Sequence, residues 1–165
     1  MADRSYPRAR VLAGAALAAA LAADLSVKHL FLSEAWNSRV LVPGLLETHY
    51  AWNRGVSFSL FWQSGSLGSG LLAALLLAVV LGFAVAAFRT AKPLVAAGLG
   101  LIVGGALGNL ADRYVHGAVF DFLVVRLGAH PLFVCNSADI FISLGVLCLA
   151  ADMLRAEPKR PQSSS

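Results

Sequence analysis

Two aspartates, Asp121 and Asp139, lie beside long apolar stretches of this sequence, in the runs 119–122 (VFDF) and 136–139 (NSAD). An ionised carboxylate is costly to hold next to hydrocarbon, so we expect these two to serve a function at adjacent helix ends. Two carboxylates in one site share a proton, because each negative charge raises the pKa of the other. One then acts as a base and the other as an acid, and the pair predicts acid–base hydrolysis.

The second aspartate belongs to a series of polar residues at helical spacing. Asn136, Asp139 and Ser143 fall at i, i+3 and i+7, on one face of an otherwise apolar helix. We expect this face to point into a helix bundle. Its simplest role is an interhelical hydrogen-bond patch, which is common for Asn and Ser but less so for Asp. The spacing therefore favours a functional role for Asp139.

A further polar group precedes the first aspartate. Asn109 shares a helix face with Asp112 and Arg113, and Arg113 is placed either to orient a carboxylate or to pair with Asp112. Small residues recur every four positions just before them, which predicts close helix packing rather than a binding site. These residues are Gly100, Gly104 and Gly108.

In the first apolar stretch, Asp24 and Lys28 have the i, i+4 spacing of a helix ion pair. Near a membrane surface such a pair serves packing or orients a site, and the alternative is a snorkelling lysine beside a neutral aspartic acid. Cys135 and Cys148 are about 20 Å apart along one stretch at about 1.5 Å per residue, which is too far for a disulfide within the chain.

The composition places the whole chain in a lipid bilayer. Hydrophobic residues make up 58% and charged residues 13%, and the mean hydropathy is +0.73. Apolar stretches at about 11–32, 67–88, 94–110 and 138–154 are near the length of a spanning helix. We predict an all-α membrane protein with four transmembrane helices, forming one integral membrane domain over residues 1–165. The external segments are then 33–66 and 111–137, and the tail 157–165 is disordered.

The cations fall on alternate sides of these spans, before the first, between the second and third, and after the fourth. This positive-inside pattern predicts that both termini are cytoplasmic, and it accounts for the basic charge without nucleic-acid binding. The N-terminus also has features of a cleavable signal, but apolar residues resume past Asp24, so we expect the segment to remain as a span. These cations are Arg4, Arg8, Arg10, Arg89, Lys92, Arg155, Lys159 and Arg160.

The external segment 33–66 is rich in aromatic and turn residues. Val40–Val42 and Thr48–Trp52 suggest short strands around a turn, and Ser57–Gln63 suggests a helix lying flat on the membrane. The aromatic residues either form a belt that anchors the protein at the headgroup layer or cover a bound substrate. We expect a small external cradle that contains β-structure.

Other chemistries find little support in the motifs. The sequence has no G-x-S-x-G, Walker loop, H-E-x-x-H or strand-following GxGxxG, so we expect no cofactor. A metal site built from Asp112, His116, Asp121 and Asp139 matches no familiar ligand spacing, so we expect no metal. The competing classes are a small proton-coupled transporter or channel and a structural assembly subunit. A transport pathway requires polar groups through the midplane, whereas these residues gather at one end.

Taken in chain order, the motifs resemble those of the bacterial lipoprotein signal peptidases, the signal peptidase II family. The resemblance covers all four expected spans and both external segments. It rests on Asp24 with Lys28, and on 53–58 (NRGVSF), 108–113 (GNLADR), 119–122 (VFDF) and 136–139 (NSAD).

The resemblance implies an aspartic endopeptidase of the bacterial inner membrane, with Asp121 and Asp139 as the catalytic pair at the external, periplasmic face. The implied substrates are diacylglyceryl-modified prolipoproteins within membrane lipid, cut just before the modified cysteine. We expect the enzyme to be a monomer. The residues implied to line or support the site are Asp24, Lys28, Asn53, Gly55, Asn109, Asp112, Arg113, Asn136 and Ala138.

One position departs from the family pattern. Members usually have Phe directly before the last Asn, where this chain has Cys135, with Phe133 two residues earlier. The change is expected to weaken substrate packing and leaves both carboxylates in place.

Overall fold

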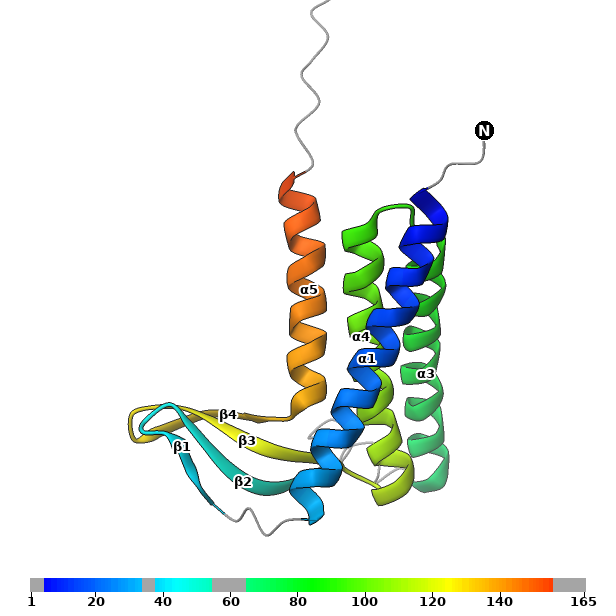
Figure 1. The fold of residues 1–165 in the computed structure, drawn as a ribbon. Helices are drawn as coiled ribbons and strands as arrows, with labels where there is room; N and C mark the ends of the chain where they lie inside the picture. Colours follow the sequence, from blue (N-terminus) through cyan, green and yellow to red (C-terminus); the bar gives the residue numbers. More distant parts are fainter. Residues whose placement is uncertain (1–4, 34–37, 55–64, 156–165) are drawn as a thin grey trace, which may run out of the picture.

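The computed structural model describes residues 5–33, 38–54 and 65–155. In that part of the chain, long helices form a bundle, and a four-stranded antiparallel sheet extends sideways from one end of it (Figure 1). The helices are α1 (Ser5–Ser33), α3 (Gly65–Arg89), α4 (Pro93–His116) and α5 (Ser137–Arg155). The strands, in their order across the sheet, are β1 (Val40–Val42), β2 (Leu46–Asn53), β3 (Val119–Leu127) and β4 (His130–Cys135).

Helix α4 is the centre of the bundle and packs against α1, α3 and α5. Its glycine stripe confirms the predicted close packing. A Cβ atom on Gly100 would lie 2.4 Å from the carbonyl oxygen of Ala13, and one on Gly104 would lie 2.5 Å from that of Leu17. On the side facing α5, a Cβ on Gly98 would lie 2.9 Å from the carbonyl oxygen of Gly145. The glycines therefore let both neighbouring backbones approach α4.

Three helices, Tyr6–Ser33, Pro93–His116 and Ser137–Arg155, are long and apolar enough to cross a membrane among the described residues. The stretch Ala74–Arg89 of α3 forms a shorter apolar helix. Many leucines and valines on the outer helix surfaces are exposed, and the core between helices is built from small residues. This distribution suits a bundle surrounded by lipid, where close packing of small residues holds helices together.

Helix α4 continues beyond the span expected from hydropathy. The expected external segment began at residue 111, but the helix runs to His116 and ends at Gly117, which has φ 71° and donates its N–H to Arg113 O at 3.0 Å. Glycine is favoured in this left-handed C-cap conformation. Asp112 and Arg113 consequently lie with Asn109 on the last turns of the helix, as their spacing predicted.

The strands confirm one expectation and correct another. Val40–Val42 is a strand as predicted, and the predicted strand Thr48–Trp52 lies within β2. No strand was predicted in the segment 111–137, yet it forms β3 and β4, so the β-structure of this mostly helical protein is more extensive than the small cradle expected from the sequence. Its β-hairpin turns at Gly128, which has φ 61°.

An aromatic cluster attaches the sheet to the end of α1. The rings of Phe31 and Phe122 stack with centroids 4.2 Å apart, and those of Tyr50 and Phe120 meet edge to face at 5.2 Å. The Tyr50 hydroxyl also donates a hydrogen bond to the Phe31 carbonyl. Phe120 and Phe122 are buried, so the face of β3 that carries them packs onto the bundle and fixes the position of Asp121 between them.

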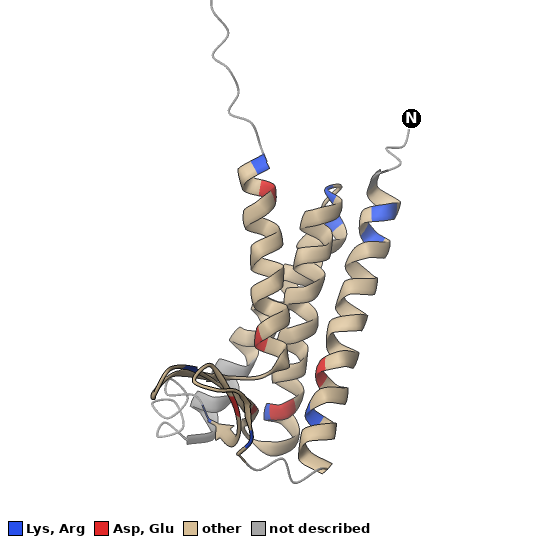
Figure 2. Cartoon of the chain, turned by 60° about the vertical axis from the view of Figure 1, so that its left-hand side comes forward, with Lys and Arg blue, Asp and Glu red and all other residues tan. Residues whose placement is uncertain are grey.

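Several basic residues lie at the end of the bundle opposite the sheet (Figure 2). There Arg10 Nε donates to the Phe88 carbonyl at 3.0 Å, and Lys92 Nζ lies 2.7 Å from Asp152 Oδ2. The start of α1, the α3–α4 turn and the end of α5 thus share one end of the molecule (Figure 1). The expected interfacial helix Ser57–Gln63, the tail 157–165 and Gly55 lie outside the described residues.

Candidate active site

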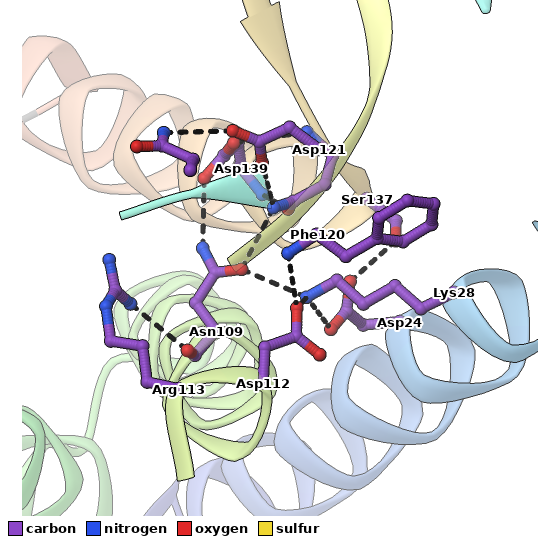
Figure 3. Close-up of polar contacts among 11 residues, drawn as sticks. Asp24, Lys28, Asn109, Asp112, Arg113, Phe120, Asp121, Ser137 and Asp139 are labelled. Atoms are coloured by element: carbon purple, nitrogen blue, oxygen red, sulfur yellow. Dashed lines mark hydrogen bonds and ion pairs between the residues drawn. The ribbon is translucent and has the colours of Figure 1, made fainter. Parts of the chain in front are cut away.

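The two aspartates come from different kinds of element. Asp139 lies in the first turn of α5, whereas Asp121 lies on β3 and not at a helix end as expected. Only 2% of Asp121 is exposed, and Asp139 is half-buried. Both side chains meet at the junction of the sheet with α4 and α5 (Figure 3).

Asn136 forms the N-cap of α5 and bridges the two carboxylates. Its Oδ1 accepts the Asp139 N–H at 3.2 Å, and its own N–H donates to Asp139 Oδ2 at 3.2 Å. These reciprocal bonds form a capping box. The Asn136 Nδ2 donates to Asp121 Oδ1 at 2.7 Å. Asn136 was expected on a face of the helix with Ser143, but it precedes the helix, and Ser143 is exposed rather than directed into the bundle.

Two further asparagines donate to the carboxylates. Asn53 Nδ2, from the end of β2, lies 2.9 Å from Asp121 Oδ2. Asn109 Nδ2, from α4, lies 3.1 Å from Asp139 Oδ1. Each of the four carboxylate oxygens therefore accepts an N–H from an uncharged amide, which orients both groups.

A buried ionic cluster lies next to these amides, between α1 and α4. Lys28 Nζ lies 2.8 Å from Asp24 Oδ2, which confirms the expected ion pair, and 2.9 Å from Asp112 Oδ2. Asp112 Oδ2 also accepts the Phe120 N–H at 3.1 Å, one residue from Asp121. Ser137 Oγ donates to Asp24 Oδ1 at 2.6 Å. The sequence motifs did not assign a role to Ser137, although it adjoins Asn136 in the first turn of α5.

The remaining expected site residues line the same region. Arg113 Nη1 donates to the Asn109 carbonyl at 3.1 Å, and Asp112 is engaged by Lys28. Ala138 is fully buried where α5 crosses α4, and a Cβ on Gly105 would lie 2.6 Å from its carbonyl oxygen. A larger residue than Ala138 would push α5, and with it Asp139, away from α4.

Burial alters the acidity of two groups outside the helices. The pKa of Asp121 is raised, chiefly because burial disfavours the charged carboxylate, and the Asp139 charge adds to the rise. The donors Asn53 and Asn136 and the charge of Lys28 act in the opposite direction. Burial and the charges of Asp139 and Asp121 raise the pKa of the Cys135 thiol to about 11, so this cysteine is protonated at neutral pH.

A cavity of about 830 Å³ is lined by α1, α3 and α4 and reaches Arg113. Six leucines of α1, α3 and α4 line it, and Arg54 and Arg113 add two guanidinium groups. Neither Asp121 nor Asp139 is among the described residues that line it. The cavity is therefore apolar with a polar margin, a chemical character that suits a lipid-like or hydrophobic chain with a polar end.

His116, which was weighed as a metal ligand, instead packs against the ring of Trp52, with centroids 5.0 Å apart. Across residues 5–33, 38–54 and 65–155, no group of three or more His, Cys, Asp or Glu side chains could hold a metal ion. In the middle of α4 the buried residues are apolar, from Leu99 to Gly105, and the buried acidic residue of this helix, Asp112, lies near its end.

Comparison with known proteins shows the family to which this chain belongs. The family model described as "Signal peptidase (SPase) II" matches residues 16–155. The chain is 50% identical over 112 residues to a lipoprotein signal peptidase of Methylorubrum extorquens (strain PA1), covering 68% of this chain and 66% of the relative. It is 38% identical over 152 residues to a lipoprotein signal peptidase of Beijerinckia indica subsp. indica, covering 90% of each.

A solved bacterial membrane enzyme has a similar fold, with a TM-score of 0.68 at 19% sequence identity, covering 93% of this chain and 94% of that one. The comparisons give no support to the transporter alternative. From the extent of the family match and the identity of these relatives, the chain belongs to the signal peptidase II family.

Proposed function

We propose that this protein is an aspartic endopeptidase that removes the signal peptide from diacylglyceryl-modified prolipoproteins, cutting before the modified cysteine. Membership of the signal peptidase II family supports a peptidase that acts on prolipoproteins. One observation carries the aspartic mechanism: Asn136 donates its backbone N–H to Asp139 and its side-chain amide to Asp121. A single residue thus links the two carboxylates.

In this mechanism the two carboxylates share one proton, which resides on Asp121. The more deeply buried carboxylate favours its neutral form, and burial raises the pKa of Asp121. Asp139 lies in the first turn of α5, where the helix N-terminus stabilises a negative charge. Asp121 is therefore the acid and Asp139 the base.

The reaction then follows from these protonation states. Asp139 removes a proton from a water molecule held between the carboxylates as the water attacks the scissile carbonyl carbon. Asp121 gives its proton to the carbonyl oxygen. When the tetrahedral intermediate collapses, Asp139 passes its proton to the leaving amino group of the modified cysteine, and the hydroxyl proton returns to Asp121. The pair ends the cycle as it began, with one proton.

Specificity comes from how the substrate lies against the bundle. The apolar cavity, with its leucine wall, takes up hydrophobic parts of the substrate, and Arg54 and Arg113 meet its polar groups. Asn53, Asn109 and Asn136 orient the carboxylates against the scissile peptide. The cysteine that replaces the usual Phe at position 135 leaves a smaller side chain beside the pair.

The proposed membrane arrangement has four spans in a single domain, with α3 as the second span. The helix ends that carry Arg8, Arg10, Lys92 and Arg155 are cytoplasmic, and the sheet with its carboxylates is external (Figure 2). The protein acts as a monomer in the inner membrane, because one chain supplies both carboxylates and all the described donors to them.

The test is cleavage by purified protein in detergent, using one prolipoprotein precursor with and without the diacylglyceryl group. We expect cleavage of the modified precursor at the bond before the modified cysteine, identified by the product masses. Cleavage at another bond, equal cleavage of both precursors, or no cleavage of the modified one would reject the proposed function.

A further inference from the structure

Lys28 is a buried cation beside the carboxylate pair, with 2% of its surface exposed. Its ammonium contacts three oxygens: Asp24 Oδ2 at 2.8 Å, Asp112 Oδ2 at 2.9 Å and Asn109 Oδ1 at 3.0 Å (Figure 3). An ammonium group has three hydrogens to donate and no acceptor. Two of these contacts are ion pairs, and the hydrogen bond to Asn109 is directed at the amide that contacts Asp139.

The contact with Lys28 decides which way the Asn109 amide faces. The ammonium contacts an acceptor, so the amide oxygen of Asn109 faces Lys28 and its NH₂ group faces Asp139. Rotating the amide by half a turn would set its NH₂ against the ammonium and its oxygen against the Asp139 carboxylate. Both contacts would then be repulsive.

Asn136 also donates to Asn109 Oδ1, at 3.0 Å, but that donor is uncharged and is shared with Asp121. A hydrogen bond from a charged donor is roughly twice as strong as one between neutral groups. The bond from Lys28 therefore makes the larger contribution to the orientation of the Asn109 amide.

Lys28 is in turn held by residues tied to the other elements of the site. Asp112 accepts the Phe120 N–H, next to Asp121, and Asp24 accepts the Ser137 hydroxyl, two residues before Asp139. The position of the ammonium is consequently fixed from α4, β3 and α5 together. Lys28, on α1, is thus linked to the carboxylate pair through other residues. Among the described residues, it makes no hydrogen bond to either carboxylate of the pair.

We propose that Lys28 is a positioning residue for catalysis: it holds the Asn109 amide so that its NH₂ donates to Asp139 and keeps that carboxylate aligned for attack. The proposal rests on the proposed peptidase function. It predicts that Lys28 acts on turnover through Asn109. The role of Lys28 is then neither in substrate binding nor in folding alone.

The test is a double-mutant cycle on cleavage of the modified precursor, with Lys28→Met, Asn109→Ala and both together. We expect Lys28→Met to lower kcat by about 100-fold while KM changes by less than about threefold. In the Asn109→Ala background the same change lowers kcat by less than about threefold further, because the group through which it acts is absent. Lys92→Met is the matched control, since Lys92 also contacts an aspartate but lies at the opposite end of the bundle; its kcat stays at the wild-type value.

Each variant is checked by gel filtration and thermal unfolding in detergent. If Lys28→Met does not fold, the cycle is run with Lys28→Met combined with Asp24→Asn, which removes one buried charge of each sign. Losses that multiply, a loss confined to KM, or an unchanged kcat would overturn the positioning role. A wild-type protein that does not cut the modified precursor overturns the proposed function instead.

A measurement that does not depend on activity tests the positioning role separately from the proposed function. The side-chain amide signal of Asn109 in an NMR spectrum, identified by its absence in Asn109→Ala, shifts in Lys28→Met and not in Lys92→Met. An Asn109 signal that is the same in all three proteins with an intact Asn109 would overturn the proposal.

Discussion

Asn53 and Asp121 show how one hydrogen bond adjusts the acidity of a proposed catalytic carboxylate. The Asn53 amide donates to Asp121 Oδ2 at 2.9 Å and stabilises the ionised form, which opposes the rise in the pKa of Asp121 caused by burial. In the proposed mechanism Asp121 must be protonated, so its deprotonation sets the alkaline limit of activity.

Asn53→Ala removes that donor and raises the pKa of Asp121 further. The alkaline limb of the kcat/KM profile therefore moves to higher pH, by about 1 pH unit. The measurement is the pH dependence of cleavage of the modified precursor from about pH 5 to 10. Glu47→Ala is the control, because Glu47 also joins β2 to β3, through Arg126 at 2.9 Å, but lies away from the carboxylates. An alkaline limb that stays in place or moves down in Asn53→Ala would contradict the assignment of Asp121 as the acid.

Residue types and spacing alone predicted part of the site. The i, i+4 spacing identified the ion pair of Asp24 with Lys28, because helix geometry brings such side chains together. The third contact of Lys28, with Asn109, joins residues 81 positions apart in the chain. Spacing along one helix cannot reveal a contact that depends on how α1 packs against α4.

Among the elements, α1 and α4 come into close contact at Gly108. A Cβ atom at this position would lie 2.0 Å from Asp24 Oδ2, inside the ionic cluster. Gly108→Ala must therefore displace either the Asp24 carboxylate or the helix, and we expect it to lower the free energy of unfolding by about 1–3 kcal/mol.

Thermal unfolding in detergent measures this effect, with Gly82→Ala as the matched control. A Cβ on Gly82, in α3, meets nothing within 4 Å, so the alanine there is neutral or slightly stabilising through its helix propensity. Equal unfolding temperatures for the two variants would show that the close contact at Gly108 is not a constraint on packing.

The helices were easier to predict than the strands, for a physical reason. Long apolar runs identify membrane helices. The sequence of β3 is also an apolar run, because both faces of this strand carry apolar residues. The turn glycine Gly128 was the available signal for a hairpin. The same limit applies to α4, where hydropathy ended the span at charged residues although the helix continues to His116.

At the scale of the whole molecule, the proposed arrangement puts the sheet on one side of the membrane. The start of α1 and the end of α5 lie on the other side (Figure 2). This can be measured by labelling single cysteines with a maleimide that does not cross membranes, in a background of Cys135→Ser and Cys148→Ser. In spheroplasts with an intact inner membrane, Ala129→Cys, in the β3–β4 turn, should be labelled from outside. Tyr6→Cys and Arg155→Cys should react only after permeabilisation. Labelling of all three positions from the same side would contradict the arrangement.

The central claim, that Asp121 and Asp139 together cut the peptide bond, is tested most directly by Asp121→Asn and Asp139→Asn in the cleavage assay, at matched thermal stability. Each variant keeps the shape of the side chain but can neither accept nor return the shared proton. We predict that each lowers kcat by at least about 10³-fold for the diacylglyceryl-modified precursor. A folded variant of either kind that cuts at the wild-type rate would contradict the account.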